Sequence, residues 1–367
     1  MIIAYDLRYA SDHFAGIGTY AYSLIEELLA LPGDERYILL WNPDWKQTRY
    51  DFDRLRSHPR VEWVERGFHP IRPQGAMQVG GWLRRVRPAV YMSPFGLRPL
   101  GSGCPEVLTL HDVAPLRLPP PGFPDLLFRL SLWLALGARY ILTVSEFSRR
   151  EILALTRARA EQVRAILPGV APFSPRLEPV RPGALTDDRF ALLVGDNRPR
   201  KNIEVAVRAW ATMGAAPPFA LVAAGPVRPG FPSLQELAAA AGARRVVQLG
   251  WVEPAELGWL YAHAEMLLLP SLYEGFGSPL AEGLAHGLPV LASDIPAFRE
   301  VGAEAAVYVD PHDAGAWARE ALRIAEDAGL RARLRPAGLA RAAELTYRKT
   351  AEGALAVLRE AARAGRP

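Results

Sequence analysis

Residues 266–282, MLLLPSLYEGFGSPLAE, join an apolar run to a glycine-rich turn and place seven residues between two glutamates. The run MLLLPS predicts a buried strand, and Ser278 followed by Pro279 predicts the N-cap and the first residue of a helix. Glu274 would then lie in the loop, and Glu282 about one turn into the helix. Glycines let backbone N–H groups approach a ligand, and a helix start favours an anion. The stretch therefore predicts a pocket with acceptors for hydroxyls and donors for phosphate, as a nucleotide sugar needs.

The bulk properties of the chain favour a two-domain cytoplasmic protein. Its 367 residues are half hydrophobic and 22% charged, which is enough for a sizeable core. The longest apolar stretch, 123–142, is interrupted by Arg129 and Arg139, so we expect no helix that spans a bilayer. The N-terminus lacks the features of a signal peptide. A single cysteine, Cys104, excludes an internal disulfide and a multi-cysteine metal site.

The chain has a net charge of +4. There is no nucleic-acid recognition motif and no dense Lys/Arg tract, so we expect no nucleic-acid partner. Scattered arginines most often form a solvated face, but several in the first half would suit an anionic acceptor or a peripheral contact with the inner face of a membrane. These positions are Arg84, Arg85, Arg87, Arg149, Arg150, Arg157 and Arg159.

Short apolar strands alternate with helical segments in both halves, which is typical of doubly wound parallel sheets. A proline-rich stretch at 167–183 predicts an ordered, non-helical linker. We therefore predict an α/β protein with two Rossmann-like domains facing across a cleft, and ligands at the carboxyl ends of the strands. The expected boundaries are 1–170 for the N-terminal domain, 171–188 for the linker, 189–346 for the C-terminal domain and 347–367 for a last helix. The predicted strands are 1–6, 37–41, 61–64, 90–93, 107–110, 140–144, 190–194, 219–224, 246–249, 266–269, 289–292 and 306–309.

The loop FAGIGTY, residues 14–20, precedes a helix predicted at 19–31. Gly16 or Gly18 would let the backbone approach a phosphate at the helix N-terminus. The full dinucleotide fingerprint is missing, and no acidic residue ends a second strand at the expected place, so a dinucleotide site is not predicted. A plain strand-to-helix turn is the alternative interpretation.

The loop GDNRPRKN, residues 195–202, carries one of only three lysines in the chain. Asn202 predicts the N-cap of a helix at 203–213, which places Arg200 and Lys201 beside the positive end of the helix dipole. Isolated cations are mildly unfavourable there, and a bound diphosphate would remove the conflict. An exposed basic turn is the alternative.

Two further strings carry polar residues of interest. TLHDV, 109–113, places His111 at the carboxyl end of a strand, where it could meet a ligand or serve the structure. Asp51 and Asp53 form a D-x-D, a pattern that can hold a metal on a diphosphate. Because they lie in a polar stretch that follows no strong buried strand, we interpret them as a solvated loop and predict no metal site.

Several strings occur together in the order found in family 4 of the retaining glycosyltransferases, and the chain resembles that family over nearly its whole length. The resemblance implies the GT-B fold, in which two Rossmann-like domains hold a nucleotide-sugar donor mainly on the second, and a last helix that crosses back to the first domain. The strings are AGIGTY (15–20), LHD (110–112), TVSEFS (143–148), PRKN (199–202), LGWV (249–252), EGFGSPLAE (274–282) and SDIPAFREV (293–301).

The resemblance also implies roles for individual residues. Glu282 would bind the ribose hydroxyls and Glu274 the sugar hydroxyls, while Lys201 and an arginine neutralise the leaving diphosphate without a metal. Many members carry that arginine directly after the glycine, where this chain has Asp196, so Arg200 or Arg198 must serve instead. The implied catalytic residues are Glu274, Lys201, Arg200 and His111, the last close to the transferred sugar. The implied donor-binding residues are Gly16, Gly18, Arg198, Val252, Phe276, Gly277, Ser278, Leu280 and Glu282.

By the same resemblance, we expect a retaining hexosyltransferase that needs no cofactor and acts in polysaccharide or glycoconjugate synthesis. GDP-mannose is the first candidate donor, followed by UDP-glucose and dTDP-rhamnose. The expected acceptor is a saccharide or a lipid-linked saccharide at the cytoplasmic face of the membrane. A nucleotide-sugar 2-epimerase of the same fold and a non-catalytic binding subunit are the alternatives.

Overall fold

The computed structural model describes residues 1–119, 125–170 and 178–365, and these fold as two compact units. Unit 1 comprises Met1–Ala171 and Thr346–Pro367, and unit 2 comprises Pro172–Leu345. The chain thus leaves unit 1, forms the whole of unit 2 and returns to unit 1 with its last helix.

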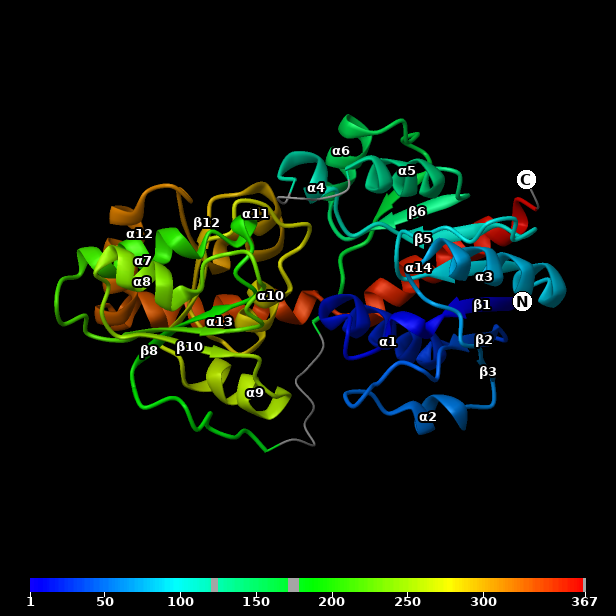
Figure 1. Cartoon of the computed structure of the whole chain (residues 1–367). Coiled ribbons are helices and arrows are strands. Elements are labelled where there is room, and N and C mark those ends of the chain that lie inside the picture. Colours follow the sequence, from blue (N-terminus) through cyan, green and yellow to red (C-terminus); the bar gives the residue numbers. More distant parts are fainter. Residues whose placement is uncertain (120–124, 171–177, 366–367) are drawn as a thin grey trace. The chain divides into compact units, whose positions relative to one another are not determined.

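Unit 1 is built on a seven-stranded parallel sheet with the strand order β3-β2-β1-β4-β5-β6-β7 (Figure 1). The order reverses between β1 and β4, as in a doubly wound sheet. The strands are β1 (Ile2–Asp6), β2 (Arg36–Trp41), β3 (Val61–Glu65), β4 (Val90–Ser93), β5 (Glu106–Thr109), β6 (Tyr140–Thr143) and β7 (Val163–Ala165). The helices are η1 (Leu7–Tyr9), α1 (Ala15–Ala30), α2 (Phe52–Arg56), α3 (Pro73–Val86), α4 (Ala114–Arg117), α5 (Asp125–Ala135), α6 (Glu146–Leu155) and α14 (Tyr347–Arg363).

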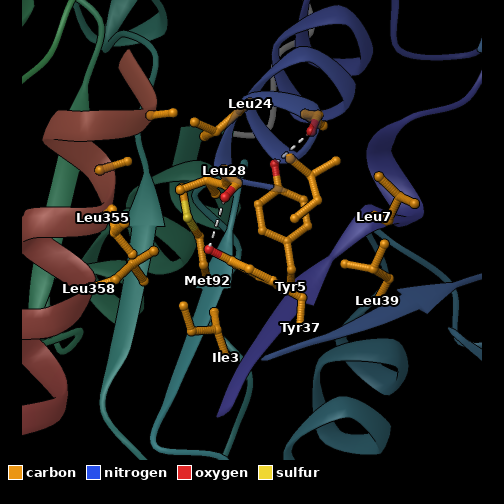
Figure 2. Close-up of a cluster of buried hydrophobic side chains, with 14 of the residues drawn as sticks. Ile3, Tyr5, Leu7, Leu24, Leu28, Tyr37, Leu39, Met92, Leu355 and Leu358 are labelled. Atoms are coloured by element: carbon orange, nitrogen blue, oxygen red, sulfur yellow. Dashed lines mark hydrogen bonds between the residues drawn. The ribbon is translucent and has the colours of Figure 1, made fainter. Parts of the chain in front are cut away.

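The largest core cluster of unit 1 lies between the sheet and the pair α1 and α14. Figure 2 shows Leu355 and Leu358 of α14 beside residues of β1, β4 and α1. The hydroxyl of Tyr5 donates to the carbonyl of Ala21 at 2.7 Å, which satisfies a polar atom inside this apolar cluster. Helix α14 therefore completes the core of unit 1 although it lies at the far end of the sequence.

Unit 2 has a six-stranded parallel sheet with the order β10-β9-β8-β11-β12-β13, which reverses between β8 and β11 (Figure 1). Its strands are β8 (Phe190–Val194), β9 (Ala220–Ala224), β10 (Val246–Gly250), β11 (Met266–Leu269), β12 (Val290–Ser293) and β13 (Val307–Val309). Its helices are η2 (Pro199–Lys201), α7 (Ile203–Thr212), α8 (Leu234–Ala241), α9 (Pro254–His263), α10 (Ser278–Ala285), α11 (Pro296–Gly302), η3 (Ala303–Ala305), α12 (Ala314–Glu326) and α13 (Ala328–Glu344).

The predicted fold class is confirmed: each unit is an α/β sheet of the Rossmann type, and all twelve predicted strands are present. Strand β7 was not predicted, because its three residues are too short to show a period. Helix α1 begins at Ala15, four residues before the predicted start, so Gly16 and Gly18 belong to its first turn rather than to a loop. Residues 171–177 of the predicted linker lie outside the described residues, and 178–188 contain no helix.

Within the described ranges, no helix combines the length and the apolar character needed to cross a bilayer.

Candidate functional site

Three predicted site residues of unit 2, Arg200, Lys201 and Glu274, meet in the loops that follow β8 and β11, which are the two strands at the reversal of the sheet order. Ligands of doubly wound sheets bind in the crevice at this point. A pocket here is lined by the charged Asp196 and Lys201, by the polar Asn197, Gln248 and Ser271, and by glycines and apolar residues of the strand ends. The loop after β8 carries Lys201, and the loop after β11 carries Ser271.

Glu274 joins these two loops. Its Oε1 accepts from the Nζ of Lys201 at 2.6 Å and from the Oγ of Ser271 at 2.8 Å, and its Oε2 lies 3.1 Å from the Nη1 of Arg200. The carboxylate is buried, and the two cations are mostly buried. The structure thus brings together Glu274, Lys201 and Arg200, three of the four residues predicted as catalytic.

The charges of this cluster keep Glu274 ionised. Burial alone would raise the pKa of its carboxyl, but the charges of Lys201 and Arg200 and the hydrogen bonds from Lys201 and Ser271 lower the pKa to about 2. The cluster carries two positive charges and one negative charge. The remaining positive charge suits an anion in the adjacent pocket.

Asn202 holds the loop that carries the two cations. It has a left-handed backbone with φ of 52°, and its Nδ2 donates to the carbonyls of Pro270 (3.0 Å) and Pro311 (2.7 Å). It occupies the predicted N-cap position of α7, but its side chain does not cap the helix. The side chain ties the β8 loop to the end of β11 instead, and so fixes Lys201 and Arg200 near Glu274.

The turn that precedes α10 depends on Gly277. Its φ of 92° is left-handed, and a Cβ there would lie 2.5 Å from the Phe298 ring. Gly277 is the N-cap of α10, so the prediction that Ser278 caps this helix is wrong; Ser278 is its exposed first residue. Phe276 is buried in the turn, and the Leu280 side chain is fully buried, which leaves only its backbone for a ligand.

Glu282 follows on α10 and has a partner that the sequence did not reveal. Its Oε2 accepts a hydrogen bond of 2.7 Å from the hydroxyl of Tyr261 on α9. The Tyr261 ring is stacked on His286, with 5.2 Å between ring centroids. Burial raises the pKa of Glu282, while the hydroxyl of Tyr261 and the charge of Lys201 partly offset this. Tyr261 therefore fixes the orientation of the second glutamate.

The two candidate arginines have different partners. Arg200 contacts Glu274, whereas the guanidinium of Arg198 pairs with Asp196, with 2.7 Å between its Nη2 and Oδ2. Asp196 is buried, and its Oδ2 also lies 3.6 Å from the Nε of Arg228. Burial raises the pKa of Asp196, but Arg198 and Lys201 lower this pKa below its usual value. Geometry therefore groups Arg200, and not Arg198, with Lys201.

Val252, the last predicted donor-binding residue of unit 2, is partly exposed just beyond β10.

The remaining predicted site residues belong to unit 1. Gly16 is exposed in the first turn of α1, where a Cβ would meet nothing. Gly18 is buried, and a Cβ there would lie 2.7 Å from the hydroxyl oxygen of Tyr50 and 3.1 Å from the carbonyl of Tyr9. Gly18 is thus needed for the packing of α1, and of the two glycines only Gly16 is exposed.

His111 lies in the loop after β5. Its Nε2 is 2.9 Å from the carbonyl of Pro94, and its ring meets Tyr20 edge-on. Since a carbonyl only accepts, Nε2 carries the proton and Nδ1 is the acceptor of the neutral ring. Burial lowers the pKa of His111, which keeps the ring neutral near pH 7.

The D-x-D pair lines a pocket together with Trp41, Trp45, Gln47, Tyr50, Phe52 and Arg56. It begins helix α2, so the prediction of a solvated loop is wrong. Asp51 caps α2 by accepting from the backbone N–H of Arg54, and Asp53 is exposed and pairs with Arg56 at 3.7 Å. Across the part of the chain that the structure describes, no three His, Cys, Asp or Glu side chains are grouped as metal ligands would be.

Comparison with known proteins gives consistent matches. A model of glycosyl transferases group 1 matches residues 177–341, and a model of glycosyltransferase family 4 matches residues 14–172. O-antigen chain mannosyltransferase B of Escherichia coli is 30% identical over 306 residues, which cover 80% of this chain and 78% of that protein. O-antigen chain mannosyltransferase RfbU of Salmonella typhimurium is 29% identical over 58% of each chain.

Solved structures share the fold at lower identity. HepE of Anabaena, in complex with UDP and glucose, matches with a TM-score of 0.74 and 16% identity over 98% of this chain and all of that chain. WaaG, a glycosyltransferase involved in lipopolysaccharide biosynthesis, matches with a TM-score of 0.70 and 18% identity over 97% of this chain and 99% of that chain. These relatives do not favour the epimerase or the non-catalytic subunit. The chain has the GT-B fold and belongs to the family 4 glycosyltransferases.

Proposed function

We propose that this glycosyltransferase transfers a hexose from a nucleoside diphosphate sugar with retention of configuration and without a metal ion. The observation that carries the proposal is the convergence of Lys201 and Arg200 on the buried Glu274 at the reversal of the unit 2 sheet. Two fixed cations beside a pocket can take the place of a metal in neutralising a leaving diphosphate.

In the proposed reaction, Lys201 and Arg200 exchange part of their interaction with Glu274 for the diphosphate oxygens. A cation about 4 Å from a phosphate oxygen stabilises it by about 4 kcal/mol in a partly buried site. The stabilisation grows as the bond between sugar and phosphate breaks, so it acts mainly on the transition state. Glu274 and the backbone N–H groups near Phe276 and Gly277 would orient the sugar hydroxyls.

Retention follows in this proposal from displacement on one face of the sugar through an oxocarbenium-like state. The acceptor hydroxyl attacks from the side that the diphosphate leaves, and a donor phosphate oxygen takes its proton. Glu282, held by Tyr261, would bind the ribose of the donor, and no protein nucleophile is needed.

Mannose from GDP-mannose is the proposed first donor, because the two O-antigen relatives are mannosyltransferases. UDP-glucose and dTDP-rhamnose are the other donors to test. The proposed acceptor is a saccharide, carried on a lipid at the cytoplasmic side of a membrane.

A thermal-shift screen with GDP, UDP and dTDP and their sugars, each with and without EDTA, tests the donor and the metal. We expect one nucleotide to raise the melting temperature equally in both conditions. Lys201→Ala should lose this shift. A shift that disappears with EDTA would instead show that nucleotide binding needs a metal ion. No shift from any nucleotide would refute the donor assignment.

Product analysis by NMR tests the reaction itself. The anomeric configuration of the product should equal that of the donor sugar. In an incubation with donor alone, the sugar should keep its stereochemistry at C2, whereas an epimerase would convert it.

A further inference from the structure

Helix α5 of unit 1 exposes large apolar side chains along one face. Leu126, Leu127, Leu130 and Trp133 are 79%, 64%, 49% and 62% exposed, and they are four of the twelve large exposed hydrophobic residues among those the structure describes. A helix of eleven residues thus holds a third of them. A concentration of this kind marks an interaction surface, unlike apolar residues scattered singly.

The opposite face of α5 is already occupied. Leu132 is buried in a cluster with Ile152 of α6, and Phe128 and Leu116 of α4 pack against that cluster. Figure 1 shows α4, α5 and α6 in the same part of unit 1. With about 100° between successive residues, the outward residues span an arc of about 160°. In order around the helix, this outward face consists of Arg129, Trp133, Leu126, Leu130, Leu134 and Leu127.

Arg129 at one edge is the only charged residue on that outward face. A helix that is apolar on all sides belongs in a protein core or in contact with lipid. Since α6 and α4 cover only the inner face, the outward face needs a second apolar partner.

The charge of the surrounding segment identifies this partner. Residues 114–159 contain seven arginines, no lysine and three carboxylates, a net charge of +4. The rest of the chain has 36 basic and 36 acidic residues, so its formal charge is zero. The segment that carries the apolar face therefore has a positive charge, although Arg117, Arg149 and Arg159 already pair with Glu151, Glu146 and Glu161. The seven arginines are Arg117, Arg129, Arg139, Arg149, Arg150, Arg157 and Arg159.

We propose that the outward face of α5 docks on an anionic lipid bilayer. The leucines and Trp133 would enter the boundary between headgroups and acyl chains, with the helix in the plane of the membrane, and the arginines of residues 114–159 would contact the headgroups. A second copy of the chain is a poorer occupant, because it would bring +4 against +4 across the interface. The inference deepens the proposed lipid-linked acceptor, but its test does not depend on transfer activity.

Flotation with vesicles tests the surface. The protein should float with vesicles of equal parts phosphatidylcholine and phosphatidylglycerol, and much less with phosphatidylcholine alone. Added salt should weaken binding, because exposed charges are screened. The double variant Leu127→Glu/Leu130→Glu should reduce the partition coefficient by about tenfold or more, since it removes two apolar contacts and adds two like charges to the anionic interface.

Met77→Glu is the matched control, because Met77 is 55% exposed on α3 of the same unit. It should float like the wild type. The double variant should keep its nucleotide-induced thermal shift, which separates the surface from the donor site. Equal flotation of the double variant and the wild type would overturn the proposal. It would also be overturned if the wild type did not bind anionic vesicles. A wild-type dimer that the double variant dissociates would assign the face to a second copy.

Discussion

Replacing Glu274 by glutamine should destabilise the ligand-free protein, because it removes the charge that compensates Lys201 and Arg200. The side chain keeps its size, so the change isolates the electrostatics. Lys201 and Arg200 are 14% and 22% exposed, and they would remain as partly buried cations without their shared carboxylate. Breaking a buried ion pair from one side costs about 3–5 kcal/mol.

The pKa of Glu274 gives a second measure of the same energy. The pKa of the Glu274 carboxyl falls from 4.5 to about 2 on folding. Each unit of pKa difference between the unfolded and folded states corresponds to about 1.4 kcal/mol of stability. The charged carboxylate therefore contributes about 3 kcal/mol of stability. Because the folded pKa is the lower one, this contribution is full above about pH 5 and is lost as the pH falls from 4.5 towards 2.

Urea unfolding at pH 7 measures the effect directly. The free energy of unfolding of Glu274→Gln should be about 3 kcal/mol lower than that of the wild type. At pH 3.5 the gap should shrink by about 1 kcal/mol, because protonation has begun to weaken the wild type. Glu265→Gln is the control: it breaks the more exposed pair with Arg189, which should cost about 1 kcal/mol or less.

Binding of a nucleoside diphosphate gives a second test of the same electrostatic account. The reasoning predicts that a nucleoside diphosphate stabilises Glu274→Gln at least as strongly as the wild type, because its phosphates replace the missing charge. A variant as stable as the wild type at pH 7, with no change in its diphosphate-induced shift, would refute the electrostatic account of this cluster.

Three further substitutions test other parts of the site. Lys201→Ala should reduce turnover by about 10²-fold or more, with an unchanged circular dichroism spectrum, because it removes a cation from the leaving group. Tyr261→Phe should raise KM for the donor and reduce discrimination between ribose and 2′-deoxyribose nucleotides, because Glu282 loses its orienting hydrogen bond; equal discrimination in variant and wild type would contradict this role. Gly277→Ala should lower the free energy of unfolding by about 1–3 kcal/mol, since it combines a positive φ with a contact against Phe298; urea unfolding measures the loss.

The sequence predicted the strands because they follow local rules, whereas the roles expected of Lys201 and Glu274 came from the family resemblance. Apolar runs of four to six residues marked the strands. A similar local contact starts α6, where Ser145 accepts from the backbone N–H of Ser148 at 2.9 Å. Lys201 and Glu274 are 73 positions apart, and they meet because parallel strands deliver their loops to one edge of the sheet.

The wrong and missing predictions concern contacts between residues that are distant in the sequence or backbone conformations that local sequence patterns do not specify. Ser278 followed by Pro279 looks like an N-cap, but the left-handed backbone of Gly277 moves the cap one residue earlier. Asn202 has a left-handed backbone and donates its Nδ2 to two carbonyls from distant loops, and its side chain makes no capping hydrogen bond to α7. The contact between Tyr261 and Glu282 depends on how α9 and α10 pack, and helical spacing alone does not give it.

The return of α14 to unit 1 sets the order in which the protein can be completed during synthesis. Unit 2 lies in one continuous stretch, Pro172–Leu345, so all of its residues leave the ribosome before the first residue of α14. Strand β1 leaves before unit 2, yet it shares its core cluster with Leu355 and Leu358. This part of the core must therefore stay partly unpacked until α14 has been made, and a chain that stops after unit 2 would leave that apolar surface uncovered.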